Sequence, residues 1–324
     1  MIPVPPAIQR FPWKLMALLA AICGFGLLVL YSAAGGNWSP WAWQQGVRFL
    51  VFLGVALVIG RLPLRLFEDF AYIGYIGVLA LLMAVELLGF VGGGSQRWLN
   101  LGFINLQPSE LMKVAIVIAL ARFYTQLPPG NTRTFTALWP ALLAIGFPAA
   151  LVMLQPDLGT ALAISIGGVV VMFVAGLPFW WFGSAAGAGV AALPILFSML
   201  HDYQQKRVLI FLDPESDPLG AGYHISQSKI AIGSGGIGGK GFLNGSQSHL
   251  DYLPEGHTDF IFATMAEEWG LIGGLALLFA FFLLLRWGTR VALRARTRFG
   301  QLTAAGLTMT IFFYIAINLS MVMG

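Results

Sequence analysis

The residues best able to do chemistry lie in one polar stretch of an otherwise apolar chain, between His201 and Glu268. This stretch holds all four histidines, more than half of the acidic residues, and a glycine-rich run from Gly233 to Gly245. It leads through Asp259 directly into a long apolar segment, so that carboxylate stands at the edge of a hydrophobic region. A polar, acid-bearing stretch on an apolar scaffold is where we expect the chemistry of this chain to take place.

Asp259 begins a predicted helix over 259–286, and two further acids follow it. Glu267 lies eight residues on, which is about 12 Å deeper along a helix axis. From residue type alone, Asp259 serves equally well as a helix N-cap together with Thr258. Glu267 and Glu268 are equally suited to hydrogen bonding between helices. Catalytic and structural roles therefore stay open at both places.

Two other sets of charges lie in or beside apolar segments, where ionisable groups are costly and usually paired or functional. Glu110 and Lys113 are three residues apart and share a helix face, so they can neutralise each other. Asp157 precedes another apolar segment, where an ordinary N-cap is the simplest interpretation.

Several patterns resemble cofactor motifs but lack their context. Gly233, Gly235 and Gly238 spell G-x-G-x-x-G, yet the sequence predicts neither a preceding strand nor a βαβ unit. The four histidines have no metal-ligand spacing, which argues against a zinc site. We therefore expect no nucleotide cofactor, no dedicated metal site and no nucleic-acid partner.

The composition indicates the environment that positions these residues. The chain is 58% hydrophobic and 10% charged, whereas a soluble domain carries about 25% charged residues. It is therefore predicted to be an all-α, polytopic membrane protein with a single transmembrane domain over 1–324, because helices satisfy their own backbone in a bilayer.

Apolar runs of about 17–25 residues mark the spanning helices. Nine runs are predicted, at about 14–34, 43–61, 70–91, 108–126, 136–154, 159–176, 178–199, 259–286 and 301–323. Residues 200–258 form one large loop, with a candidate amphipathic helix over 225–232 followed by a tightly turning glycine run. Because basic residues that flank the spans fall on one side, the amino terminus is predicted to be cytoplasmic and the large loop extracytoplasmic.

A series of motifs in a specific order carries a family resemblance. The motifs are Arg97-Trp98-Leu99-Asn100, Gln107-Pro108-Ser109-Glu110 with Lys113, Gln155-Pro156-Asp157-Leu158-Gly159-Thr160, Asp213-Pro214 through Gly222-Tyr223-His224, Gln227-Ser228-Lys229-Ile230-Ala231-Ile232-Gly233, Gly245-Ser246-Gln247-Ser248, and Leu253-Pro254-Glu255-Gly256-His257-Thr258-Asp259 with Glu267-Glu268. Their order and spacing resemble the SEDS family (shape, elongation, division, sporulation) nearly end to end. His224, Lys229 and the segment 239–241 favour its elongation branch, RodA, over its division branch, FtsW.

The resemblance implies a bacterial inner-membrane peptidoglycan glycosyltransferase that polymerises lipid II into glycan strands on the outer face during cell elongation and shape maintenance. A sugar 4-hydroxyl attacks the anomeric carbon of a lipid-linked sugar, and the lipid diphosphate leaves. Asp259 matches the family's essential aspartate and is expected to be the general base. A diphosphate is a good leaving group, so no strong general acid is required.

The leaving diphosphate needs positive charge, for which Arg97 and Arg207 are preferred because a guanidinium binds phosphate oxygens in a bidentate way. A divalent cation, Mg²⁺ or Mn²⁺, would serve the same purpose. Glu110, Lys113 and Asp157 are expected to support the outward cavity and the loop. The other substrate-binding or supporting candidates are Trp98, Lys206, Lys229, Lys240, Glu255, His257 and Glu267.

The resemblance also implies a partner, a single-span class B penicillin-binding protein that cross-links the strands, besides membrane lipids and other elongation-complex proteins. Family members typically have ten spans, with an outer loop and a last helix after the ninth. We therefore expect this chain to be truncated after Gly324.

Two alternative functions remain. A lipid II flippase or another transporter would also carry acids in its spans, but alternating access favours midplane polar groups and an internal repeat, and the sequence shows no convincing repeat. A non-catalytic scaffold predicts that Asp259 can be replaced while cell-wall complexes persist.

Overall fold

The structure, a computed structural model, describes residues 11–92, 95–100, 105–128, 130–199, 205, 209, 221–249 and 256–324. These residues are mostly helical, which confirms the predicted all-α class. The chain forms two compact units. The first comprises Met1–Arg61, Leu196–Trp287 and Ala316–Gly324, and the second comprises Leu62–Ile195 and Gly288–Ile315.

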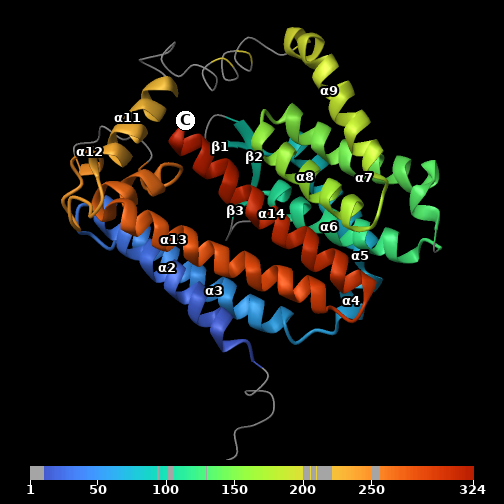
Figure 1. Ribbon diagram of the computed structural model, residues 1–324, viewed down its shortest axis with the longest axis horizontal. Coiled ribbons are helices and arrows are strands. Elements are labelled where there is room, and N and C mark those ends of the chain that lie inside the picture. The colour runs from blue at the N-terminus through green and yellow to red at the C-terminus, as the bar shows by residue number, and fades with distance from the viewer. Residues whose placement is uncertain are drawn as a thin grey trace, which may run out of the picture. The chain divides into compact units, whose positions relative to one another are not determined.

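The first unit is built from helices that come from both ends of the sequence (Figure 1). They are α2 (Trp13–Ala33), α3 (Trp41–Ile59), α11 (Ala221–Ser234), α12 (Ser246–His249), most of α13 (Ile261–Arg294) and the end of α14 (Arg298–Met323). Ala231, Phe260, Ala263 and Val322 are buried together and join α11, the start of α13 and the end of α14. This small apolar cluster fixes the surroundings of Asp259.

The second unit packs around α6, whose residues Met112, Ile116, Val117 and Tyr124 are completely buried. Its elements are α4 (Leu64–Asp69), α5 (Ala71–Leu88), β1 (Phe90–Gly92), β2 (Ser95–Asn100), β3 (Asn105–Leu106), α6 (Pro108–Gln126), the 3₁₀ turn η1 (Asn131–Arg133), α7 (Phe135–Leu154), α8 (Leu158–Val174), most of α9 (Phe179–Met199), and the remaining parts of α13 and α14. As the sequence predicts, α6 starts with Pro108 in its first turn.

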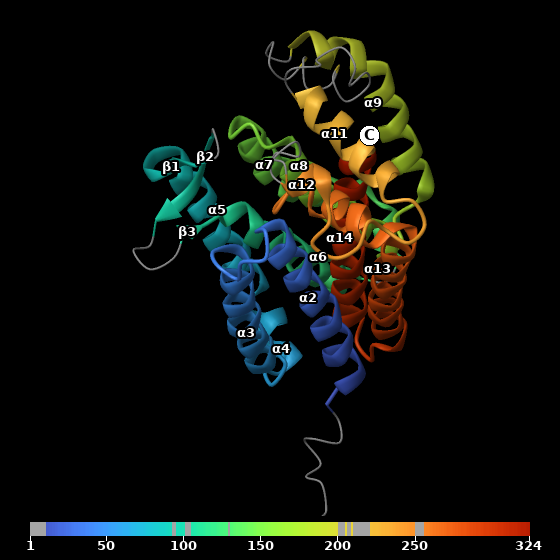
Figure 2. The ribbon, with the colours of Figure 1, turned by 90° about the vertical axis from the view of Figure 1, so that its left-hand side faces the viewer.

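A small antiparallel sheet lies at the end of α5, between the spans predicted at 70–91 and 108–126 (Figure 2). In this sheet β2 pairs with β1, with Phe90 opposite Trp98, and with β3, with Leu99 opposite Leu106. The sheet holds Arg97 and Trp98 in extended backbone.

By length and composition, five of the described helices are able to cross a membrane: α2, α3, α7, α13 and α14. α5 and α8 are shorter apolar helices. Large apolar side chains such as Phe52, Leu143 and Phe279 are about 60% exposed, at 61%, 62% and 61%. Such exposure suits a surface in contact with lipid, where apolar groups face hydrocarbon.

The segment predicted as one helix over 259–286 is interrupted in the structure. Gly270 has φ +64° and ψ −162°, which is not a helical conformation and is open essentially to glycine alone. Gly270 therefore divides α13 into a first part (Ile261–Trp269) and a second part that continues to Arg294.

Candidate active site

Asp259 lies in the turn 256–260 that leads into α13, and its backbone is held on both sides. The hydroxyl of Thr264, in the first turn of α13, donates to the carbonyl oxygen of Gly256 at 3.1 Å. The side-chain amide of Asn318 on α14 donates to the carbonyl oxygen of Asp259 at 3.4 Å. Phe260 is buried in the apolar cluster of the first unit. The turn that carries Asp259 is therefore held by one local contact, from Thr264, and by one contact distant in sequence, from Asn318.

The carboxylate of Asp259 is exposed, and it makes no hydrogen bond or ion pair with any residue that the structure describes. α13 begins at Ile261, whose amide donates to the carbonyl of Thr258 at 3.4 Å and not to a side chain. The described contacts therefore do not show the N-cap role that the sequence left open. A free carboxylate on a restrained backbone is the arrangement that a general base requires.

His257 is fixed by an aromatic contact two residues before Asp259. Its ring stacks on Trp41, the first residue of α3, with ring centroids 3.8 Å apart and an interplanar angle of 10°. This contact adds α3 to the elements that hold the turn.

Lys229 belongs to α11, a helix that lies next to the end of α14 (Figure 1). The hydroxyl of the neighbouring Ser228, which is fully buried, donates to the carbonyl of Val322 at 2.7 Å. The Lys229 ammonium is close to Gly324, since a Cβ built there would be 2.6 Å from Nζ. Asn318 and Val322 are four residues apart and lie on the same face of α14. Asp259 contacts this helix through Asn318, and α11 contacts it through Val322.

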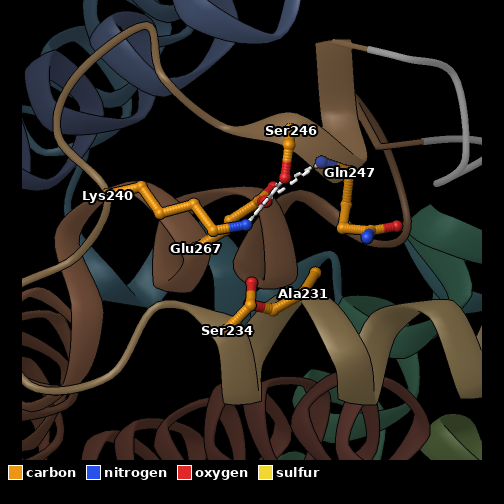
Figure 3. Close-up of polar contacts among 6 residues, drawn as sticks. All are labelled: Ala231, Ser234, Lys240, Ser246, Gln247 and Glu267. Carbon is orange, nitrogen blue, oxygen red and sulfur yellow. Dashed lines mark hydrogen bonds and ion pairs between the residues drawn. The ribbon is translucent and has the colours of Figure 1, made fainter.

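Glu267, one helix turn beyond Thr264, is the centre of a buried polar network (Figure 3). Its carboxylate is 0% exposed and accepts hydrogen bonds from Lys240 Nζ at 2.6 Å, from the Ser246 hydroxyl at 3.1 Å and from the Gln247 amide at 3.0 Å. The Lys240 ammonium also donates to the Ser246 hydroxyl at 2.7 Å. The network ties the glycine-rich loop and α12 to α13, and it occupies Lys240.

The glycine-rich loop also fills the break in α13 with main-chain hydrogen bonds. In an unbroken helix the amides of Leu271 and Ile272 would donate to the carbonyls of Glu267 and Glu268. Here those two amides donate to loop carbonyls, and the two carbonyls accept from loop amides. The four bonds are Leu271 to Gly236 at 2.9 Å, Ile272 to Ile237 at 3.2 Å, Lys240 to Glu267 at 3.0 Å and Gly241 to Glu268 at 3.0 Å. The loop thus replaces two missing helix bonds with four of its own.

Arg97 and Asp157 form a compact polar group in the second unit. Arg97 donates from Nε to the Gln155 carbonyl at 3.1 Å and from Nη2 to the Pro156 carbonyl at 2.6 Å, and Nη1 lies 3.5 Å from the Asp157 carboxylate. Asp157 caps α8 by accepting from the amide and the hydroxyl of Thr160. The guanidinium is thereby engaged with protein groups, and the neighbouring Trp98 is half-buried.

Lys113 and Glu110 form the ion pair that their spacing predicts, with 2.7 Å between Nζ and the Glu110 carboxylate. Lys113 is 5% exposed, and its ammonium also lies 4.3 Å from the centre of the Tyr314 ring. A buried ammonium is stabilised by such an acid and by the face of an aromatic ring. The contacts support a structural role in joining α6 to α14.

The predicted residues fall into three groups. Asp259, His257, Lys229, Lys240 and Glu267 lie in the first unit. Arg97, Trp98, Glu110, Lys113 and Asp157 lie in the second. Lys206, Arg207 and Glu255 lie outside the described residues.

Thr264, Asn318 and Trp41 are neighbours of the turn that were not predicted from the sequence. Polar side chains at 264 and 318 within apolar helices were the available signal. In the described part of the chain, no group of three or more His, Cys, Asp or Glu side chains is placed to hold a metal ion.

Comparison with known proteins identifies the family. Residues 13–324 match the family described as cell cycle protein, which covers FtsW, RodA and SpoVE. The chain is 45% identical over 316 residues to the peptidoglycan glycosyltransferase MrdB of Escherichia coli K12, covering 97% of this chain and 84% of MrdB.

Two solved structures are also similar over nearly the whole chain. One, described as "Structural coordination of polymerization and crosslinking by a peptidoglycan synthase complex", has a TM-score of 0.80 at 33% identity and covers 97% of this chain and 88% of its own. The other, RodA of Thermus thermophilus, has a TM-score of 0.71 at 28% identity, with 98% and 87% covered. With its apolar helices, the chain is a multi-pass inner-membrane protein. It belongs to the cell cycle protein family of FtsW, RodA and SpoVE.

Proposed function

We propose that this chain is a peptidoglycan glycosyltransferase of the elongation branch, which polymerises lipid II into glycan strands. Support for the activity comes from the name of MrdB, a relative 45% identical over 97% of the chain. The observation that carries the site assignment is the exposed, unpaired carboxylate of Asp259 on a turn held by Thr264 and Asn318.

In the proposed reaction, Asp259 is the general base. It takes the proton from the 4-hydroxyl of one sugar while that oxygen bonds to the anomeric carbon of a lipid-linked sugar. The bond from that carbon to the lipid diphosphate breaks, and the diphosphate leaves with the electron pair. Attack opposite an α-linked leaving group gives a β-1,4 link. A positioned base contributes about 10²–10⁴-fold to such a step.

Among the described basic residues of the first unit, Lys229 is the best candidate to contact the diphosphate. It is exposed and makes no ion pair with a described residue, whereas Lys240 is bound to Glu267 at 2.6 Å. Arg97 is engaged by Gln155, Pro156 and Asp157. Lys206 and Arg207 keep their proposed roles as phosphate ligands.

A divalent cation is retained in the proposal as a further means to neutralise the diphosphate. Because the described residues provide no cluster of three or more ligands, no residue is assigned to hold it. Titration of Mg²⁺ and Mn²⁺ in the polymerisation assay tests this point.

We further propose that the amino terminus faces the cytoplasm and that Asp259 faces outward, where lipid II polymerisation takes place. The partner in this proposal is a class B penicillin-binding protein. Support comes from the similar structure whose description couples polymerisation to crosslinking in one synthase complex.

The deciding experiment measures glycan strands formed from purified lipid II by the wild-type protein and by Asp259→Asn, each with and without a matching transpeptidase. Glu86→Gln is the matched control, because Glu86 is also an exposed acid of this chain. We expect polymer from the wild type and from Glu86→Gln, and none from Asp259→Asn at equal thermal stability.

Polymer from Asp259→Asn at the wild-type rate would overturn the assignment of the base. If none of the proteins forms polymer and the wild type transfers lipid II across vesicle membranes, the chain is a flippase and not a polymerase.

A further inference from the structure

The positive charge of this chain is concentrated at the turn between α13 and α14. From Trp269 to Gly324 the sequence has five arginines and no Lys, Asp or Glu, which gives a net charge of +5. Subtracting this +5 from the +4 of the whole chain leaves −1 for all other residues. The turn therefore differs in charge from the rest of the protein.

Three of these arginines, Arg290, Arg294 and Arg296, are here called the arginine turn. All three are exposed, and none makes an ion pair or hydrogen bond with a described residue. Arg290 and Arg294 are four residues apart on α13, which places their Cβ atoms about 5–6 Å apart on one face. Arg298 is different, because its Nη2 donates to the Ala175 carbonyl at 3.0 Å.

Apolar side chains accompany the arginine turn. Leu293 is 75% exposed and directly precedes Arg294. Leu64 of α4 is 44% exposed, and its Cδ2 lies 3.1 Å from the place of a Cβ at Gly300, so α4 packs against the turn. Arg65, also exposed, follows Leu64 and adds a fourth charge on this side of the second unit.

One acid near Arg65 is engaged elsewhere. Asp69, at the other end of α4, forms an ion pair with Arg122 at 3.7 Å. Within the described residues, none of the three residues of the arginine turn has an ion-pair partner.

We propose that the arginine turn, together with Arg65, binds the phosphate groups of anionic phospholipids. Guanidinium groups bind phosphate oxygens in a bidentate way, which an ammonium does not. Exposed leucines beside the charges fit a surface whose headgroup phosphates adjoin hydrocarbon, and clusters of basic residues next to a spanning helix attract anionic lipid. The bias that orients a membrane protein is produced by Lys and Arg alike. That bias therefore does not explain why the basic residues of 269–324 are all arginines.

The test uses the full chain purified in detergent, with palmitoyl-oleoyl phosphatidylglycerol and phosphatidylcholine as probes, and native mass spectrometry to count bound lipids. We expect phosphatidylglycerol to bind in preference to phosphatidylcholine. Arg290→Gln with Arg294→Gln should weaken the apparent affinity about 25-fold, because each basic residue near an anionic surface contributes about fivefold. Arg290→Lys with Arg294→Lys should weaken it less than the glutamine pair does, because an ammonium keeps the charge but loses the bidentate contact. The matched control Arg133→Gln should not change it.

Equal phosphatidylglycerol binding by the wild type and the double glutamine variant would overturn the proposal. If the glutamine variant does not fold, the lysine variant decides, and full wild-type affinity there would overturn recognition by arginine. A poly-glutamate peptide that binds the wild type, with no preference between the two lipids, would assign the surface to an acidic protein partner instead.

Discussion

The hydroxyl of Thr264 donates to the carbonyl oxygen of Gly256 at 3.1 Å, and both groups are buried. This bond joins the first turn of α13 to the start of the turn that carries Asp259. It joins two residues that are eight positions apart, one on each side of the proposed base. The bond therefore restrains the turn that carries the proposed base.

Thr264→Val removes this hydrogen bond while keeping the side-chain shape. It leaves the Gly256 carbonyl buried without its partner, which costs about 1–3 kcal/mol of stability. A displacement of about 1 Å at a reacting group costs about 100-fold in rate. Because the Asn318 contact still restrains the turn, we expect a smaller displacement, with kcat for lipid II polymerisation falling about tenfold and KM nearly unchanged. Steady-state kinetics with lipid II, together with thermal unfolding, provide the measurement.

Two controls separate positioning from a general loss of packing. Thr264→Ser keeps the hydroxyl and should recover most of kcat. Thr308→Val removes a buried hydroxyl that donates to Ala304 within its own helix at 2.7 Å, and it should leave kcat unchanged. A Thr264→Val protein with wild-type kcat would show that the bond does not position Asp259.

Gly270→Ala tests the break in α13. Alanine is strained at φ +64° and ψ −162°, and its Cβ would lie 2.6 Å from the Ile237 carbonyl oxygen of the loop. We expect a loss of about 3 kcal/mol or more, from backbone strain of about 1–3 kcal/mol plus the displaced loop. Thermal unfolding of the purified protein measures the loss.

Gly274→Ala is the matched control on the same helix. A Cβ there would meet the Phe262 ring at 3.8 Å, an ordinary contact. Alanine favours helix over glycine by about 1 kcal/mol, so this variant should be neutral or stabilised. Equal stability of both alanine variants would mean that the loop does not depend on the Gly270 conformation.

Local features of this fold are predictable from the sequence, and long-range ones are not. The Glu110 and Lys113 pair and the Asp157 cap follow from spacing along a single helix, and the structure contains both. The break at Gly270 depends on a loop some 30 residues earlier in the chain, so the periodicity of α13 carries no trace of it. The feature of the sequence that could have indicated the break is the presence of glycines both in the loop 233–245 and at Gly270 of α13.

Lys240→Met tests the network around Glu267. The buried carboxylate would lose its ammonium partner at 2.6 Å and keep only Ser246 and Gln247 as donors. Removing one partner of a buried pair costs about 3–5 kcal/mol, and Lys240 is partly exposed, so the lower end is expected. Glu267→Gln should cost less, because a neutral amide leaves no buried charge.

The double variant Lys240→Met with Glu267→Gln completes a thermodynamic cycle with the two single changes. We expect it to be more stable than Lys240→Met alone, because the uncompensated carboxylate is then gone. Additive losses in thermal unfolding would mean that Lys240 and Glu267 do not interact.

Arg97→Lys distinguishes a structural arginine from a ligand of the diphosphate. The structure engages its guanidinium with the carbonyls of Gln155 and Pro156, at 3.1 and 2.6 Å, and with Asp157 at 3.5 Å. A lysine reproduces at most part of this set, so we expect a stability loss of about 1–3 kcal/mol with an unchanged KM for lipid II. Lys229→Met should show the opposite result, a KM raised about tenfold at wild-type stability, since a hydrogen bond to a charged group contributes about 1.5–3 kcal/mol. A raised KM for Arg97→Lys at unchanged stability would return Arg97 to the substrate site, and it would mean that its contacts with Gln155 and Pro156 open when lipid II binds.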